Sequence, residues 1–418
     1  MEEELAHKYA QITQSTLVSS ASFNRELSLF AGIPAIDLKL SCKDIKNKAK
    51  RAWNCTLVAQ AKAENPDLIE FLQSSALTSV SSDESFRKVS CCGQYRVSVF
   101  KAEDKDCKGQ VISVWKGTEM LATASTDKLC GKLCMNGAPF SGFCFDLSKS
   151  RVLFVADSKQ KKDTSFWDEE NSPDSGDVKP KGFGYDIKEH FGERLYEFLA
   201  PRVFSFDFFK GIIEQVSFDL PLSCCALGQL TLSPNGRLLA FVGWPDSNRR
   251  LGSVYYNSRK SVLFLHDLKT LKTWRVASDC HSPQYPRFCP DGKQLYFVTT
   301  KETWCHNHSF KLMRLILEDE ALEVCIDHVK SPTGDFTGLW SPLLENPFLT
   351  EKLMILNTSF RSITGAILFS CTDKAFFRMS LPPGYEPNCS LTVQEVHLES
   401  RHLIAFVESL SMPSHVEL

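Results

Sequence analysis

The sequence has no long hydrophobic run and no excess of charge of either sign. Lysine and arginine (48) nearly balance aspartate and glutamate (50), which leaves a net charge of −2. No segment approaches the ~20 uncharged apolar residues that cross a bilayer, and no basic cluster indicates a nucleic-acid surface. The start of the chain, MEEELAHKYAQITQ, lacks the basic and apolar parts of a secretory signal. We therefore expect a cytoplasmic protein that binds neither nucleic acid nor membrane.

Motifs for nucleophilic catalysis and for phosphate binding are also missing. A nucleophilic serine on a strand-to-helix turn needs small neighbours, as in Gly-x-Ser-x-Gly, yet none of the 21 glycines has serine two residues later. There is no Gly-Gly pair for an HGGG-type oxyanion loop. The segment Gly182–Asp186 (GFGYD) lacks the third glycine of a dinucleotide-binding loop. We therefore expect no catalytic and no cofactor-binding residue in the chain.

Sixteen cysteines are scattered along the chain, and without a secretory signal we expect most to be free, partly buried thiols. Metal-ligand residue types form two groups, Cys305, His306 and His308, and then Cys325 with His328. Structural zinc sites usually use two closely spaced pairs that converge on a tetrahedral ion. Because the spacing here is irregular, we expect an ordinary polar loop and no metal site.

An internal repeat is the strongest signal for the fold. The segment Leu230–Trp244 (LTLSPNGRLLAFVGW) recurs as Pro286–Thr300 (PRFCPDGKQLYFVTT), with Pro234 and Pro290 56 residues apart. In both copies two apolar-rich strands flank a Pro-Asn/Asp-Gly turn. Proline presets this turn, and glycine supplies the positive φ that a tight hairpin needs.

Weaker copies have the same form. They occur around Pro342, 52 residues after Pro290, and at His397–Ser409 and Gly142–Ser158, while Ser261–Ser278 is a further strand pair. Two hairpins per period of ~50 residues make about four strands per unit, which predicts the blades of a β-propeller. A generic β-sandwich is the alternative, but sandwiches do not show such long-range self-similarity.

The pattern predicts an all-β chain with three parts. Residues 1–22 open with acidic side chains and apolar spacing on one face, which predicts a short helical extension. Residues 23–418 form the propeller, with strand patterns from about Val89, about six recognisable blades and an incomplete C-terminal end. Residues 159–186 are charged and contain Pro, Gly and Ser, which indicates an exposed insertion.

One stretch goes beyond the general propeller pattern. Within Leu239–Leu268 lie Phe241-Val242-Gly243-Trp244, Arg250-Leu251-Gly252 and Asn257-Ser258-Arg259-Lys260-Ser261. These motifs resemble the propeller of the acylaminoacyl-peptidases, also called acylamino-acid-releasing enzymes or acylpeptide hydrolases, of the prolyl oligopeptidase family. The resemblance continues in order over about residues 90–410.

The resemblance implies a ring of seven or eight blades that precedes an α/β-hydrolase domain carrying a Ser-Asp-His triad. It further implies a serine hydrolase that releases N-acyl amino acids from short peptides, with the propeller restricting access to the active site. No triad residue can be transferred to this sequence. We therefore expect a propeller region that is inactive alone and meets N-acylated short peptides only if a hydrolase domain is supplied.

Two other functional hypotheses stay open. The chain can be a free-standing propeller that binds proteins, either as a homo-oligomer or as the partner of a full-length paralogue. A hydrolase with an unconventional nucleophile is the weakest hypothesis, because no motif supports it.

Overall fold

The computed structural model describes most of the chain. The residues that it describes are 17–25, 35–44, 49–62, 65–73, 78–79, 84–104, 107–126, 129–135, 139–159, 185, 189–192, 194–247, 250–256, 258–301, 308–332, 334–398, 401–409 and 415–417. The only helical element described is a single 3₁₀ turn, η1 (Leu147–Lys149).

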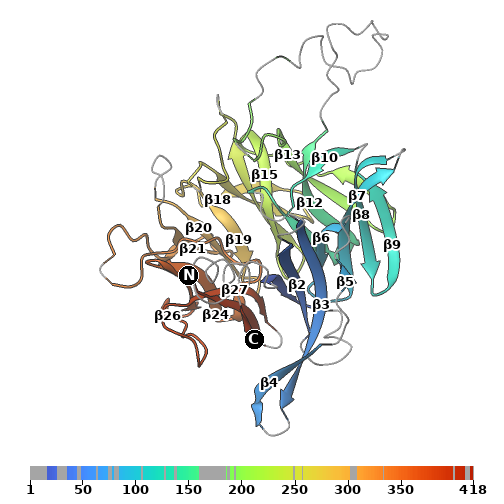
Figure 1. Cartoon of the computed structure of the whole chain (residues 1–418). Helices are drawn as coiled ribbons and strands as arrows, with labels where there is room; N and C mark the ends of the chain where they lie inside the picture. The colour runs from blue at the N-terminus through green and yellow to red at the C-terminus, as the bar shows by residue number, and fades with distance from the viewer. Residues whose placement is uncertain are drawn as a thin grey trace, which may run out of the picture.

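Seven antiparallel sheets follow one another along the chain and form a seven-bladed β-propeller (Figure 1). This confirms the all-β propeller, with seven blades where the repeats had indicated about six. In most blades each strand pairs with the next one in the sequence, as expected for units built from two successive hairpins.

The strands of the first three blades carry the following bounds. Blade 1 comprises β1 (Leu17–Phe23), β2 (Ala35–Asp44), β3 (Ala49–Lys62), β4 (Asn65–Gln73) and β5 (Thr78–Ser79). Blade 2 comprises β6 (Glu84–Val89), β7 (Tyr95–Asp104), β8 (Cys107–Lys116) and β9 (Glu119–Ser125). Blade 3 comprises β10 (Cys130–Leu133), β11 (Phe143–Asp146), β12 (Arg151–Ser158), β13 (Pro201–Asp207) and β14 (Ile212–Gln215).

The remaining four blades have these bounds. Blade 4 comprises β15 (Cys224–Leu232), β16 (Leu238–Pro245), β17 (Val262–Asp267) and β18 (Thr273–Val276). Blade 5 comprises β19 (Gln284–Phe288), β20 (Gln294–Thr299), β21 (Lys311–Ile316) and β22 (Leu322–Ile326). Blade 6 comprises β23 (Phe348–Thr350), β24 (Leu353–Phe360), β25 (Ile363–Ser370) and β26 (Phe376–Arg378). Blade 7 comprises three described strands, β27 (Ser390–His397), β28 (His402–Glu408) and β29 (His415–Glu417).

The two strongest repeat copies are the first hairpins of blades 4 and 5, as predicted. Gly236 (φ 69°) and Gly292 (φ 70°) occupy the same left-handed position of the turns β15–β16 and β19–β20, where a side chain would be strained. The predicted register of the copy around Pro342 is wrong. This proline lies ahead of β23 and not in a turn between two strands.

A second turn recurs between the last two strands of blades 3 and 4. In blade 4 the Asp267 carboxylate accepts the backbone N–H groups of Lys269 (2.8 Å) and Thr270 (3.1 Å). In blade 3 Asp207 accepts those of Phe209 (3.1 Å) and Lys210 (2.9 Å). An aspartate in this position therefore closes the turn by replacing backbone hydrogen bonds.

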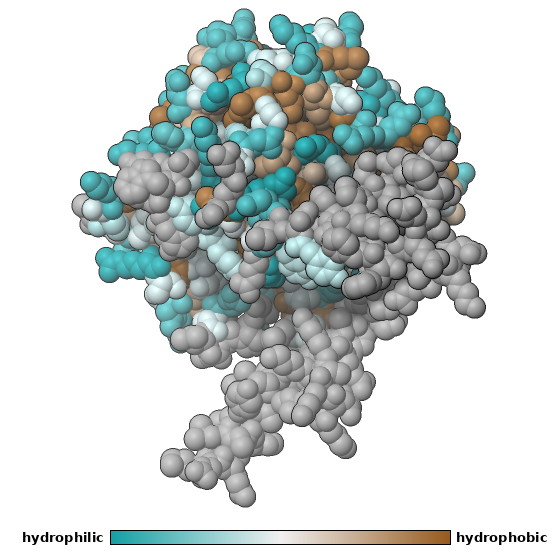
Figure 2. Space-filling view, turned by 90° about the horizontal axis from the view of Figure 1, so that it is seen from above, coloured by the Kyte–Doolittle hydropathy of each residue, from teal (hydrophilic) through white to brown (hydrophobic). Residues whose placement is uncertain are grey.

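The middle strands are apolar on both faces because each blade packs against its neighbours. In β16 and β12 six consecutive residues are buried, and all six residues of β17 are buried. Phenylalanines supply much of this packing; for example, Phe86 of blade 2 stacks on Phe143 of blade 3 with ring centroids 4.3 Å apart. Seen from above, the described surface carries small hydrophobic groups between hydrophilic ones (Figure 2).

Blade 1 is the part of the fold that the sequence patterns missed. Residues 17–22, which were expected within a helical extension, belong to strand β1. Residues 1–16 lie outside the described residues. The expected insertion at residues 159–186 also lies outside them, apart from Lys159 and Tyr185. Blade 1 packs against blade 7 through a buried cluster that contains Phe23, Ile36 and Ile404. The first and last blades of the chain are therefore neighbours in the ring.

From blade 2 to blade 7, every blade shares a buried hydrophobic cluster with the next blade. Among the described residues, no cluster contains side chains of both blade 1 and blade 2.

Candidate functional site: a charged axis

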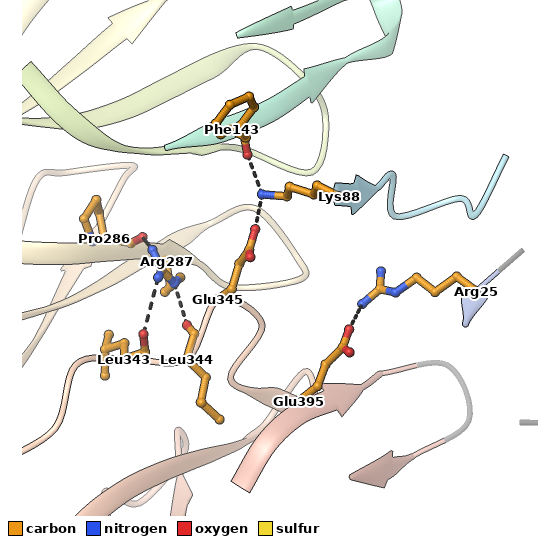
Figure 3. A network of polar contacts seen from close by, with 9 residues as sticks. All are labelled: Arg25, Lys88, Phe143, Pro286, Arg287, Leu343, Leu344, Glu345 and Glu395. Carbon is orange, nitrogen blue, oxygen red and sulfur yellow. Dashed lines mark hydrogen bonds and ion pairs between the residues drawn. The ribbon is translucent and has the colours of Figure 1, made fainter. Parts of the chain in front are cut away.

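Five charged side chains from five different blades face one another near the centre of the ring (Figure 3). They lie on or beside the first strand of their blades, and the first strands of blades 4 and 5, of blades 6 and 7, and of blades 7 and 1 contact each other. The group, which we call the charged axis, contains three cations and two carboxylates: Arg25, Lys88, Arg287, Glu345 and Glu395.

Lys88, at the end of β6, connects three blades. Its ammonium donates hydrogen bonds to the Phe143 carbonyl of blade 3 and to the Glu345 carboxylate just ahead of blade 6. Burial alone would lower the pKa of Lys88, but the charge and the hydrogen bond of Glu345, together with weaker charges nearby, outweigh it and raise that pKa. Burial would likewise raise the pKa of Glu345, but the cations around it lower that pKa. Both groups are therefore ionised at neutral pH.

Water reaches this ion pair despite its central place. The Glu345 side chain keeps 60% of its surface accessible and Lys88 keeps 24%. An open, charged centre is a feature that a polar solute can interact with, whereas a closed apolar centre would exclude it.

Arg287 on β19 holds the segment that carries Glu345. Its guanidinium donates to the carbonyls of Leu344 (2.6 Å from Nε) and Leu343 (3.3 Å from Nη2), and to that of Pro286 (2.7 Å from Nη1). A planar guanidinium with five donors suits such a set of backbone acceptors.

Arg25 and Glu395 join blade 1 to blade 7. The Arg25 Nη2 atom lies 3.1 Å from Glu395 Oε1, while Oε2 accepts the Phe23 N–H at 2.8 Å. Glu395 follows a register shift of β27 after Val393, and such bulges re-aim side chains. Burial raises the pKa of Glu395, and the nearby Arg25 charge offsets this only in part.

Similar irregularities occur on the first strands of blades 4 and 5. Gln229 on β15 has φ 54° and is buried. Its side chain donates to the Pro139 carbonyl (3.0 Å) and accepts the Tyr285 N–H of blade 5 (2.7 Å). This one side chain therefore connects blade 4 to both of its neighbours around the axis.

The charged axis can bind or repel charged solutes through its three cations and two carboxylates. Beside it lies the Cys144 thiol, whose pKa burial raises to about 11. A thiol needs a lowered pKa to react at neutral pH. Lys88 and Glu345, the charged neighbours of Cys144, are held in their ionised forms.

The structure separates the residues that the sequence grouped as metal-ligand types. His308 and His328 lie close, with ring centroids 5.0 Å apart, whereas Cys325 packs beside a different cluster, that of blades 5 and 6. Cys305 and His306 lie outside the described residues. Among the residues that the structure describes, no three His, Cys, Asp or Glu side chains gather as metal ligands.

Thirteen cysteines with described side chains form no disulfide among themselves, and eight of them are buried. Cys91 and Cys92 are exposed. No helix of the described residues has the length and apolar character needed to cross a membrane.

Sequence reasoning missed all five residues of the charged axis. Each is a single charged residue near the first strand of its blade, and Arg25 and Glu395 are 370 positions apart. The one available signal was Arg287, which interrupts an otherwise apolar repeat copy (YPRFCPDG).

The model of the "Acylamino-acid-releasing enzyme, N-terminal domain" family matches residues 2–380 of this chain. The chain belongs to this family. The resemblance stated from the sequence motifs is thereby confirmed.

Curated relatives are distant members of the same family. Acylamino-acid-releasing enzyme 1 of Oryza sativa subsp. japonica is 26% identical over 264 residues, which cover 53% of this chain and 33% of the rice protein. The acylamino-acid-releasing enzyme of Sus scrofa is 25% identical over 260 residues, covering 58% and 34%. The match therefore spans about a third of the length of these relatives.

Solved structures show the same fold at low sequence identity. The Pyrococcus horikoshii acylaminoacyl peptidase superposes with a TM-score of 0.53 at 9% identity, covering 97% of this chain and 51% of the archaeal one. A prolyl endopeptidase from a study of inter-domain dynamics gives 0.54 at 10% identity, covering 100% and 50%. This family member thus corresponds in fold to about half of such enzymes.

Proposed function

We propose that this chain is the propeller region of an acylamino-acid-releasing serine hydrolase and that it controls which peptides reach the active site. The observation that carries the proposal is the water-accessible charged axis at the centre of a propeller of this family. Side chains from five blades meet there, so the axis can discriminate among peptides by size and charge.

The chemistry itself belongs to a hydrolase domain in this proposal. The seven blades contain no α/β-hydrolase sheet among the described elements, and the sequence contains no Gly-x-Ser-x-Gly motif. The substrate class is short peptides with an acylated N-terminus, and the proposed compartment is the cytoplasm.

The proposal is tested in two steps. The purified chain alone is expected to show no turnover of N-acetyl-alanine p-nitroanilide. Fused ahead of the hydrolase domain of a family member, it is expected to allow cleavage of an N-acetylated tripeptide and to block an N-acetylated 30-residue peptide.

The charged axis supplies the decisive variant. Lys88→Met with Glu345→Met removes both members of the central ion pair and is expected to relax the length limit of the fusion while leaving the tripeptide rate within about twofold. Arg361→Met, an exposed arginine that lies 3.8 Å from Asp335, is the matched control. An unchanged length limit in the double variant would contradict a role of the axis in peptide selection. Turnover by the chain alone would contradict the proposal that catalysis belongs to a hydrolase domain.

The alternative is a non-catalytic propeller that binds a full-length paralogue or a second copy of itself. Exposed aromatic side chains on surface loops favour this reading; Tyr196 and Tyr255 are 65% and 68% exposed. A tagged chain that captures the paralogue from an extract, and loses it when Tyr196 and Tyr255 are changed to Ser, would support it. Failure to retain any paralogue would speak against it.

A further inference from the structure

The antiparallel hairpin of β21 and β22 brings two histidines together at the end of blade 5. His308 precedes β21 by three residues and His328 follows β22 by two, and Leu312 pairs with Ile326 within the hairpin. The two ring centroids lie 5.0 Å apart with an interplanar angle of 43°. Strand pairing therefore fixes this pair, which the sequence spacing alone did not favour.

Both histidines line a hollow of about 340 Å³ on the surface of the ring. Its other lining side chains include Ser309, Lys330, Thr337 and Trp340. The His308 side chain forms no hydrogen bond with another residue that the structure describes, so its ring nitrogens are not committed to the fold there.

The protonation of His328 follows from its partners. Its Nδ1 atom lies 3.2 Å from the Ser309 carbonyl oxygen and 2.9 Å from Ser309 Oγ. A carbonyl oxygen can only accept, so we assign the proton to Nδ1, which donates to these oxygens. Ser309 Oγ also accepts the Val329 N–H at 3.0 Å. Nε2 of His328 then carries the lone pair.

This arrangement is the one that metal-binding histidines use. A histidine that ligates a metal through one nitrogen usually donates its other N–H to a carbonyl or a similar acceptor, which fixes the ring. Two imidazoles that bind one ion at about 2.1 Å, with an angle near tetrahedral, place their ring centroids roughly 5 Å apart. The observed centroid separation of 5.0 Å matches this distance.

We propose that His308 and His328 bind a borderline divalent transition-metal ion, with water completing its coordination. Imidazole ligands suit zinc, nickel and copper. Two ligands make a weaker site than the four-ligand zinc site that the sequence argued against. The bound ion would link the entry of β21 to the exit of β22.

The charges around the pair bear on the affinity. The Asp327 carboxylate beside His328 already accepts the His328 N–H (2.7 Å) and pairs with Lys311 (2.9 Å). Lys330 lines the hollow with its charge exposed to solvent, which screens its repulsion of a cation. The two imidazoles therefore supply the binding.

The test is calorimetric titration of the full chain with Ni²⁺ after its accessible thiols have been alkylated. The unmodified sequence is expected to bind one Ni²⁺ that His308→Ala and His328→Ala each weaken at least tenfold. Ser309→Ala keeps both imidazoles but removes Oγ, the nearer of the two oxygens that orient His328, and is expected to weaken binding by about 10- to 100-fold. His281→Ala, an exposed histidine elsewhere in blade 5, is expected to bind as the parent does.

Melting temperatures in the presence of EDTA show whether each variant folds. His308 lies in a surface segment, so the His308→Ala variant keeps the test valid even if the buried Ser309 proves essential for folding. Equal Ni²⁺ binding by the parent chain and by the His308→Ala, His328→Ala double variant would overturn the proposal.

Discussion

Replacing Arg25 with methionine is expected to destabilise the closure between blades 1 and 7 in a pH-dependent way. Arg25 and Glu395 are 14% and 21% exposed, so the pair is largely but not fully removed from water. Methionine keeps the apolar stem of arginine and removes its charge. Among the described residues, it leaves the buried Glu395 with the Phe23 N–H as its hydrogen-bond donor.

The magnitude follows from the burial of the pair. Breaking a fully buried ion pair costs about 3–5 kcal/mol, and losing a hydrogen bond to a charged group costs about 1.5–3 kcal/mol. Because part of each side chain is still exposed to water, we expect a loss of about 2 kcal/mol in the free energy of unfolding at pH 7.5.

The sign of the pH dependence follows from Glu395. Its pKa in the folded protein is already raised, because burial disfavours the carboxylate more than Arg25 favours it. Without Arg25 that pKa rises further, so folded Arg25→Met takes up a proton at a higher pH than the unfolded chain does. The stability deficit should therefore shrink by about 1 kcal/mol between pH 7.5 and pH 5, since one pKa unit corresponds to about 1.4 kcal/mol.

Urea unfolding at both pH values measures the effect, and hydrogen exchange of the β1 amides locates it. When Arg25→Met is combined with Glu395→Gln, the stability deficit should no longer depend on pH, because no carboxylate is left to titrate at this position. Arg361→Met, at the exposed pair with Asp335, should change stability by less than about 0.5 kcal/mol. A deficit of Arg25→Met that is equal at both pH values would refute the reasoning.

Three further variants probe the fold around the axis. Gln229→Leu leaves the Tyr285 N–H and the Pro139 carbonyl without their partner, and should cost about 1–3 kcal/mol in urea unfolding. Gly228→Ala places a Cβ 2.5 Å from the Phe140 carbonyl oxygen, so it should cost more than about 2 kcal/mol, and a fully stable variant would contradict the close packing. Asp267→Asn removes a carboxylate whose pKa is lowered to about 2, mainly by its hydrogen bonds with Arg237. The free energy of unfolding should fall by about 1–2 kcal/mol at pH 7. This loss should vanish as the pH falls toward 2, because the interactions that lower the pKa stabilise only the ionised form.

Those parts of the fold that depend on local chemistry could be predicted from the sequence. The Pro-Asn/Asp-Gly turns of blades 4 and 5 appear as expected because a turn with a left-handed position leaves few residue choices. The strand pair of blade 4 around Asp267 was also located correctly. These signals are short in range and recur with the period of the blade.

Blade 1 escaped prediction because its strands do not carry the apolar runs of the other blades. β2 (AIDLKLSCKD) and the start of β3 (AKRAWN) mix lysine, arginine and aspartate with apolar residues. Their place in the ring depends on contact with blade 7 at the other end of the chain, for example between Ile36 and Ile404. A contact of that sequence separation leaves no local pattern to read.

The charged axis was invisible for the same reason, since each residue contributes from a separate blade. Its arrangement also clarifies how the ring is held. Lys88 ties blade 2 to the segment ahead of blade 6, and Arg25 ties blade 1 to blade 7. The axis that we propose to discriminate among peptides therefore also joins blades whose residues are far apart in the sequence.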